Sequence, residues 1–145
     1  MASRPARAAT RAFVRAVGRA RAEGAPAPRG LRRRVALETI FRAMPRQVDR
    51  TRAAREDGVV EWRIRDGEGG VDIWRMTLED GRCRVARGGA ESPRTRIEMS
   101  TGDFFAVVTG NADAMALWLD KRIQIEGDLV FAGTLASLFR VPRRT

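Results

Sequence analysis

The sequence contains no histidine, no tyrosine and only one cysteine among its 145 residues. Without histidine there is no His general base, no histidine-assisted serine or cysteine nucleophile, and little basis for most zinc sites. No glycine-rich pattern of the phosphate-loop or dinucleotide-binding type is present. No pair of carboxylates has a spacing that indicates acid–base catalysis. We therefore expect a protein that is not an enzyme and that uses no metal or other cofactor.

Long hydrophobic runs are also missing. No stretch of about 18 apolar residues is present, so a transmembrane helix is not expected. The N-terminal residues lack the apolar core of a secretory signal, and Arg143–Thr145 is not a peroxisomal targeting sequence. Cys83, the single cysteine, cannot form a disulfide within the chain, which favours a reducing compartment. Together these features predict a cytoplasmic protein.

The formal net charge of +10 belongs to one end of the chain. Residues 1–55 contain 15 arginines and 3 acidic residues, a net charge of +12, whereas residues 56–145 contain 13 basic and 15 acidic residues, a net charge of −2. No nucleic-acid partner is expected, because the second part is slightly acidic and Phe13 is the one aromatic residue among the arginines of residues 1–30. Arginine outnumbers lysine 27 to 1, a bias typical of a GC-rich bacterial genome.

Residues 1–30 form a basic leader that differs in composition from the rest of the chain. Residues 4–22 have the periodicity of an amphipathic helix, and Pro26 and Pro28 indicate a linker after it. Two interpretations stay open: a solvated, partly disordered tail, or a basic helix that contacts an anionic membrane or a protein partner. In the second interpretation the contacts come from arginines that share one helical face, Arg4, Arg7, Arg11, Arg15 and Arg19.

Residues 31–145 are expected to form one folded domain, which begins with a helix at residues 31–44. Alternation of apolar and charged residues then predicts strands with one buried face. Asp80-Gly81, a strong hairpin signal, joins two of these strands. We interpret the four strands as an antiparallel meander, at residues 60–65, 71–79, 82–85 and 94–100.

The helical period returns after residue 100. Two short helices precede a fifth strand at residues 123–126. The last helix, residues 129–139, contains no charged residue and is apolar around most of its circumference. Because it is too short to span a bilayer, it is either a buried core helix or a lid over an apolar cavity. A dimer interface is a third interpretation.

Several of these segments occur in the order of a known family. Thr109-Gly110 ends one helix, Ile123–Asp128 reads Ile-Gln-Ile-Glu-Gly-Asp, and the apolar last helix follows. In this order, residues 95–139 resemble the C-terminal half of the sterol carrier protein type-2 domain. The likeness extends over about residues 31–145 and leaves the leader unexplained.

The resemblance implies an α+β fold, in which a five-stranded, mainly antiparallel sheet carries helices over one face and encloses an apolar tunnel. It also implies non-catalytic intracellular binding or transfer of a lipid, namely a fatty acid, acyl-CoA, phospholipid or sterol. An alternative is an accessory domain that presents a lipophilic intermediate to a partner enzyme at the membrane surface.

Apolar side chains on the inner strand faces and on the helices are the candidate lipid contacts, because methionine and aromatic side chains adapt to ligands of variable shape. Each of them is also compatible with an ordinary core position, and both interpretations stay open. The expected partners are a hydrophobic small molecule and, through the leader, an anionic membrane. The oligomeric state is left open. The candidate lipid contacts are Trp62, Trp74, Met76, Ile97, Met99, Phe104, Phe105, Val108, Met115, Trp118, Ile125, Leu129, Phe131, Leu135, Leu138 and Phe139.

Overall fold

The computed structural model describes residues 30–138, with side chains described through Leu135. The predicted leader helix with its five arginines lies outside the described residues, as does Phe139. Within the described part, no helix is long and apolar enough to cross a membrane. The elements are α2 (Gly30–Gln47), α3 (Arg50–Ala53), β1 (Gly58–Arg65), β2 (Val71–Glu79), β3 (Arg82–Arg87), β4 (Thr95–Ser100), α4 (Thr101–Val108), α5 (Ala114–Leu119), β5 (Gln124–Gly127) and α6 (Leu129–Leu138).

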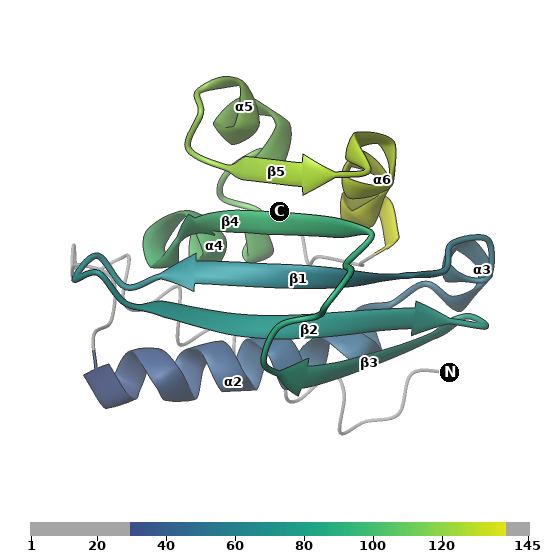
Figure 1. Ribbon diagram of the computed structural model, residues 1–145, viewed down its shortest axis with the longest axis horizontal. Coiled ribbons are helices and arrows are strands. Elements are labelled where there is room, and N and C mark those ends of the chain that lie inside the picture. The colour runs from purple at the N-terminus through teal and green to yellow at the C-terminus, as the bar shows by residue number, and fades with distance from the viewer. Residues whose placement is uncertain (1–29, 139–145) are drawn as a thin grey trace.

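The five strands form one sheet in the order β3-β2-β1-β4-β5. Three neighbouring pairs are antiparallel, and the central pair, β1 with β4, is parallel. Figure 1 shows the sheet face-on, with α2 and α4 behind it. Apolar residues of α2, α4, α5 and α6 share one core cluster with the inner strand faces. The predicted α+β class and the five-stranded, mainly antiparallel sheet are confirmed.

The predicted antiparallel meander is wrong at its last step. β4 does not pair with β3 but lies beside β1, so that Val60 is opposite Thr95 and Ile64 is opposite Met99. The connecting segment, residues 88–94, crosses the outer face of the sheet in front of β2 and β1 (Figure 1). Alternating apolar and charged residues identify a strand and its buried face, but they do not identify the strand that lies beside it.

A buried carboxylate holds this crossing segment on the sheet. Glu61 points to the outer face of β1 and is only 3% exposed. It accepts one hydrogen bond from the Ala90 amide, at 3.0 Å, and another from Nε of Arg96. Gly89 passes so close that a Cβ there would lie 2.6 Å from Glu61 Oε1. Burial alone would raise the pKa of Glu61, but the hydrogen bonds from Ala90 and Arg96 outweigh burial and lower the pKa, so the carboxylate stays ionised.

An aromatic cluster covers the inner face of the sheet beneath α2. The ring of Phe41, on α2, is stacked between Trp74 and Phe104 at centroid distances of 4.9 and 5.1 Å. Trp62 meets Phe41 and Phe104 edge-on, at 6.1 and 6.0 Å. The three stacked rings are fully buried. This half of the interior is therefore filled by the protein's own side chains at ordinary core density.

A buried arginine, Arg33, fixes the N-terminal part of α2. Arg33 donates hydrogen bonds to Thr101 Oγ1 and to the Ile64 carbonyl, each at 2.8 Å, and pairs with Asp72. These partners belong to the first residue of α4 and to the β1–β2 hairpin. A guanidinium is tolerated inside a protein only when it is paired and hydrogen-bonded in this way. One side chain therefore joins α2, α4 and the central hairpin.

Truncation of the stacked ring tests whether this cluster carries the stability of the fold. Phe41→Ala should lower the free energy of unfolding by about 3–5 kcal/mol, because it removes a buried ring and leaves a cavity. Val35→Ala, on the exposed side of the same helix, should change that free energy by no more than about 0.5 kcal/mol. Urea denaturation of both variants measures the difference, and equal effects would contradict the placement of Phe41 in the core.

Candidate functional site

The candidate lipid contacts separate into three groups in the structure. Three of them lie at the surface: Met115, Trp118 and Leu129. Another three are half-buried: Trp62, Val108 and Ile125. The side chain of Leu138 and all of Phe139 fall outside the described part. The buried group comprises Trp74, Met76, Ile97, Met99, Phe104, Phe105, Phe131 and Leu135. Burial alone does not distinguish a ligand contact from a core residue, so the binding role of these residues stays a prediction.

Several of the half-buried apolar residues that pack against the core belong to α4, β5 and α6. Val108 ends α4, Ile125 lies in β5 and Ala132 lies in α6, and all three pack against the core without being enclosed by it. α6 contacts β4 and β5, and it adds the buried side chains of Phe131 and Leu135. Apolar surface of this kind, held inside a rigid frame, is what lines small-molecule sites. The region between α4, β5 and α6 is therefore the candidate site.

Trp62 lies at the boundary between the filled half and the candidate site. Its cross-strand neighbours are Trp74 in β2 and Ile97 in β4. Both neighbours are buried, whereas Trp62 is only half-buried. The Nε1–H group of Trp62 is itself buried and has no hydrogen-bond acceptor in the structure described. A buried donor without an acceptor is unusual and unfavourable by about 1–3 kcal/mol.

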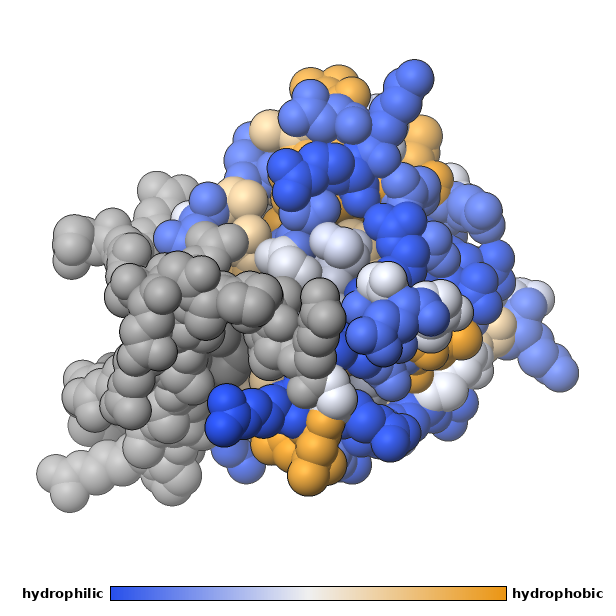
Figure 2. Space-filling view, turned by 90° about the vertical axis from the view of Figure 1, so that its left-hand side faces the viewer, coloured by the Kyte–Doolittle hydropathy of each residue, from blue (hydrophilic) through white to orange (hydrophobic). Residues whose placement is uncertain are grey.

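The short helices α5 and α6 also leave apolar side chains in solvent. Met115, Trp118 and Leu129 are 54%, 37% and 51% exposed, and the neighbouring Leu119 and Val130 are exposed as well. The sequence did not indicate this orientation, because a helix without charged residues has no polar face to mark its outer side. Figure 2 shows that, on one side of the molecule, apolar residues form separate small areas within a charged surface.

The two buried carboxylates of the described part are both paired with arginines. Within residues 30–138, no cluster of three or more His, Cys, Asp and Glu side chains is arranged to hold a metal ion. The buried Asp103 of α4 is paired with Arg122, as Glu61 is with Arg96 on the outer face. Burial raises the pKa of the Cys83 thiol to about 12, which leaves almost no reactive thiolate at neutral pH.

A cleft beside the start of α2 has a largely charged lining. This cleft has a volume of about 330 Å³, and its lining includes Arg33, Arg34, Asp66, Glu68 and Asp72. Arg33 is engaged by the core contacts described above, and Asp66 Oδ1 accepts hydrogen bonds from the amides of Glu68 and Gly70. These side chains shape the β1–β2 turn, and the charged lining does not suit an apolar ligand.

Comparison with known sequences identifies one family. The sequence profile of the SCP-2 sterol transfer family matches residues 37–140, which is most of the chain. Human sterol carrier protein 2 is 24% identical over 82 residues. The matched region covers 56% of this chain but only 15% of the human protein.

Solved structures show the same fold. The crystal structure of sterol carrier protein 2 like 2 from Aedes aegypti is 22% identical, with a TM-score of 0.56, and the match covers 73% of this chain and 98% of that chain. The solution structure of the palmitated form of that mosquito protein is 23% identical, with a TM-score of 0.59, over 69% of this chain and 90% of that chain.

An enzyme contains a region of similar fold. The stereoselective inverting sec-alkylsulfatase Pisa1 from Pseudomonas sp. is 15% identical, with a TM-score of 0.63. The match covers 70% of this chain and 16% of the alkylsulfatase. The chain therefore spans only a small part of that enzyme and of the human protein, and at these identities the structural likeness concerns the fold alone.

Proposed function

The chain belongs to the SCP-2 sterol transfer family, and we propose that its folded part binds a lipid without transforming it. The observation that carries this proposal is the set of half-buried apolar residues between α4, β5 and the charge-free α6. The ligand is a fatty acid, acyl-CoA, phospholipid or sterol. The protein acts in the cytoplasm, where its single cysteine stays reduced.

The packing of the interior limits where the ligand lies. The stack of Phe41, Trp74 and Phe104 leaves no room for a chain beneath α2. Val108 and Ile125 are the predicted contacts that keep accessible apolar surface on the other side. We therefore assign the lipid to the region under α6, with Trp62 at its inner boundary. The unsatisfied Nε1–H of Trp62 supports a ligand that carries a hydrogen-bond acceptor.

Apolar burial alone is sufficient for useful affinity. A sixteen-carbon chain removes about 14 methylenes from water at roughly 0.8 kcal/mol each, or about 11 kcal/mol in total. Association and ordering cost about 4–15 kcal/mol, and at the lower end of this cost about 7 kcal/mol of the gain remains, which corresponds to micromolar binding. Micromolar binding with broad selectivity is the expected result, and it needs no ionised partner inside the site. The palmitated state of the mosquito relative supports a ligand of this class.

A bulky substitution in the candidate site tests the proposal. Val108→Trp should weaken binding of a fluorescent fatty acid to the delipidated protein by at least about tenfold, because the indole occupies space that ligand methylenes would fill. Val71→Trp is the matched control, since Val71 is an exposed residue at the start of β2. Circular dichroism checks that both variants fold. Equal binding by the two variants would contradict the proposed location, and no binding by the unsubstituted protein would contradict the function.

A second candidate function is that of an accessory domain, which presents a lipophilic intermediate to a partner enzyme at a membrane surface. The likeness to a domain-sized part of a much larger alkylsulfatase favours this candidate. The Arg-rich residues 1–29 would then contact the anionic membrane or the partner.

Removal of residues 1–29 separates the two candidates. In the accessory function, the shortened chain should lose its association with vesicles that contain anionic lipid, because phosphate–arginine attraction is lost. Fatty acid binding should stay unchanged, since α2 begins only at Gly30. Vesicle co-sedimentation and the fluorescent probe measure the two properties. Unchanged vesicle association would remove the support for membrane contact through Arg4, Arg7, Arg11, Arg15 and Arg19.

A further inference from the structure

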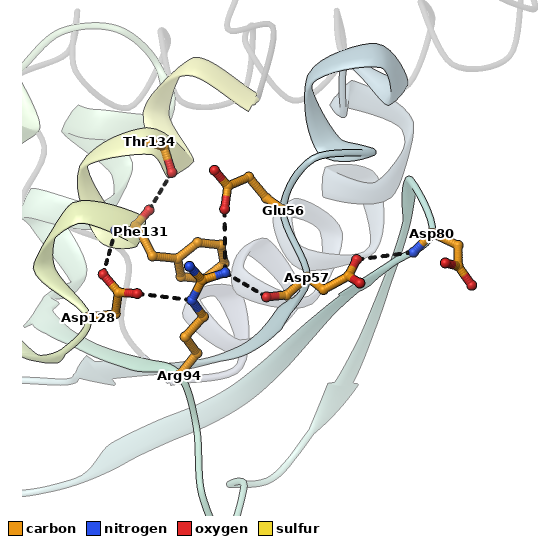
Figure 3. A network of polar contacts seen from close by, with 7 residues as sticks. All are labelled: Glu56, Asp57, Asp80, Arg94, Asp128, Phe131 and Thr134. Carbon is orange, nitrogen blue, oxygen red and sulfur yellow. Dashed lines mark hydrogen bonds and ion pairs between the residues drawn. The ribbon is translucent and has the colours of Figure 1, made fainter.

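The first turn of α6 is held by the side chains of Asp128, which directly precedes it, and of Arg94, which lies far from it in the sequence. Asp128 precedes α6, and its Oδ1 accepts a hydrogen bond from the Phe131 amide at 2.9 Å, as a helix N-cap does. Its other oxygen, Oδ2, accepts a hydrogen bond from Nε of Arg94 at 3.0 Å. The guanidinium of Arg94 also lies over the ring of Phe131, 4.0 Å from the ring centre. Figure 3 shows these contacts around the start of α6.

The same guanidinium is fixed on its far side by the segment before β1. Nη1 of Arg94 donates to the carbonyl of Asp57 at 2.7 Å and lies 3.4 Å from a carboxylate oxygen of Glu56. Asp57 is in turn tied to the β2–β3 hairpin, because its carboxylate accepts a hydrogen bond from the Asp80 amide. Arg94 therefore connects the start of α6 to the segment just before β1 (Figure 3).

Two glycines leave the space that Arg94 occupies. A Cβ at Gly58 would lie 2.7 Å from Cδ of Arg94, and a Cβ at Gly127 would lie 2.5 Å from the Arg94 carbonyl oxygen. Gly127 also has a positive φ of 96°, which side chains disfavour. The backbone on both sides is thus shaped to let Arg94 reach Asp128.

Among the described side chains, α6 buries fewer large apolar groups than α2 does. Through Leu135, α6 buries the side chains of Phe131 and Leu135, whereas Leu129 and Val130 face solvent. α2 buries four large apolar side chains and Arg33. Because Phe131 is also the ring beneath the guanidinium, displacement of α6 would break its main apolar contact and its polar contact together.

We propose that Arg94 is a latch that holds α6 closed over the lipid site, and that opening of this latch sets the rate at which lipid enters and leaves. This inference rests on the proposed lipid-binding function. In the latch, the paired groups are Arg94 on one side and Asp128 with Phe131 on the other. Arg94 is a positioning residue: it acts on the ligand only through α6.

Two substitutions in the full-length protein test the latch. Asp128→Asn keeps an oxygen that can cap α6 but removes the ion pair, so amide hydrogen exchange at residues 133–138 should rise about 2–5-fold. Arg94→Met removes the ion pair and the cation–π contact, and the rise should reach about 5–30-fold. Arg84→Met is the matched control, because Arg84 pairs with Glu79 at the sheet edge opposite to β5.

The rates of lipid exchange complete the test. Stopped-flow uptake and release of a fluorescent fatty acid should both accelerate in the order Arg84→Met, Asp128→Asn, Arg94→Met, with the equilibrium affinity changing less than either rate. The latch would be overturned if Asp128→Asn and Arg94→Met both show the same amide hydrogen exchange and the same lipid uptake and release rates as Arg84→Met. If the unsubstituted protein takes up no fatty acid, the proposed lipid binding is contradicted. The proposal that Arg94 sets the rate of lipid exchange is then contradicted as well. Uptake by the unsubstituted protein at rates that no variant alters overturns the latch alone.

Discussion

The parallel pairing of β4 with β1 is the constraint on which the rest of the structure depends. It places β5 at the edge of the sheet beside β4, and residues of α4, α5 and α6 share one hydrophobic core with those of α2. The chain reaches this position only by crossing the outer face, where the buried Glu61 receives the amide of Ala90 and the side chain of Arg96. The crossing segment also ends at Arg94, directly beside the start of β1.

The two sides of this interior differ in how completely their apolar side chains are buried. Beneath α2, stacked aromatic rings and a paired arginine form a closed core that fixes the fold. Beside α6, Val108 and Ile125 are only half-buried, and among the side chains described through Leu135 α6 buries Phe131 and Leu135. The proposed lipid binding would use such a division, since a site that exchanges its ligand must open without unfolding the domain.

Much of this fold could be predicted from the sequence, because local periodicity reports burial. The strict alternation around Trp62 and the uncharged run after Asp128 gave the strands and the last helix within one or two residues. The partner of β4 could not be predicted that way. One signal was available: seven residues, 88–94, are more than a tight hairpin needs. The roles of Arg33 and Arg94 could not be predicted from the sequence, because the chain contains many arginines and only the structure shows which partners these two have. For the site, hydrophobicity predicts candidate contacts, but only the packing separates buried core residues from surface residues such as Met115 and Leu129.

The proposed lipid site lies beneath α6, and its occupancy can be measured. Native mass spectrometry of the full-length protein purified from cells, followed by organic extraction, tests it most directly. We expect a co-purifying acyl chain, phospholipid or sterol, or a one-to-one complex when fatty acid is added to delipidated protein. A mass equal to that of the chain alone, with no uptake of added fatty acid, would contradict it and show that the interior is closed by the protein's own side chains.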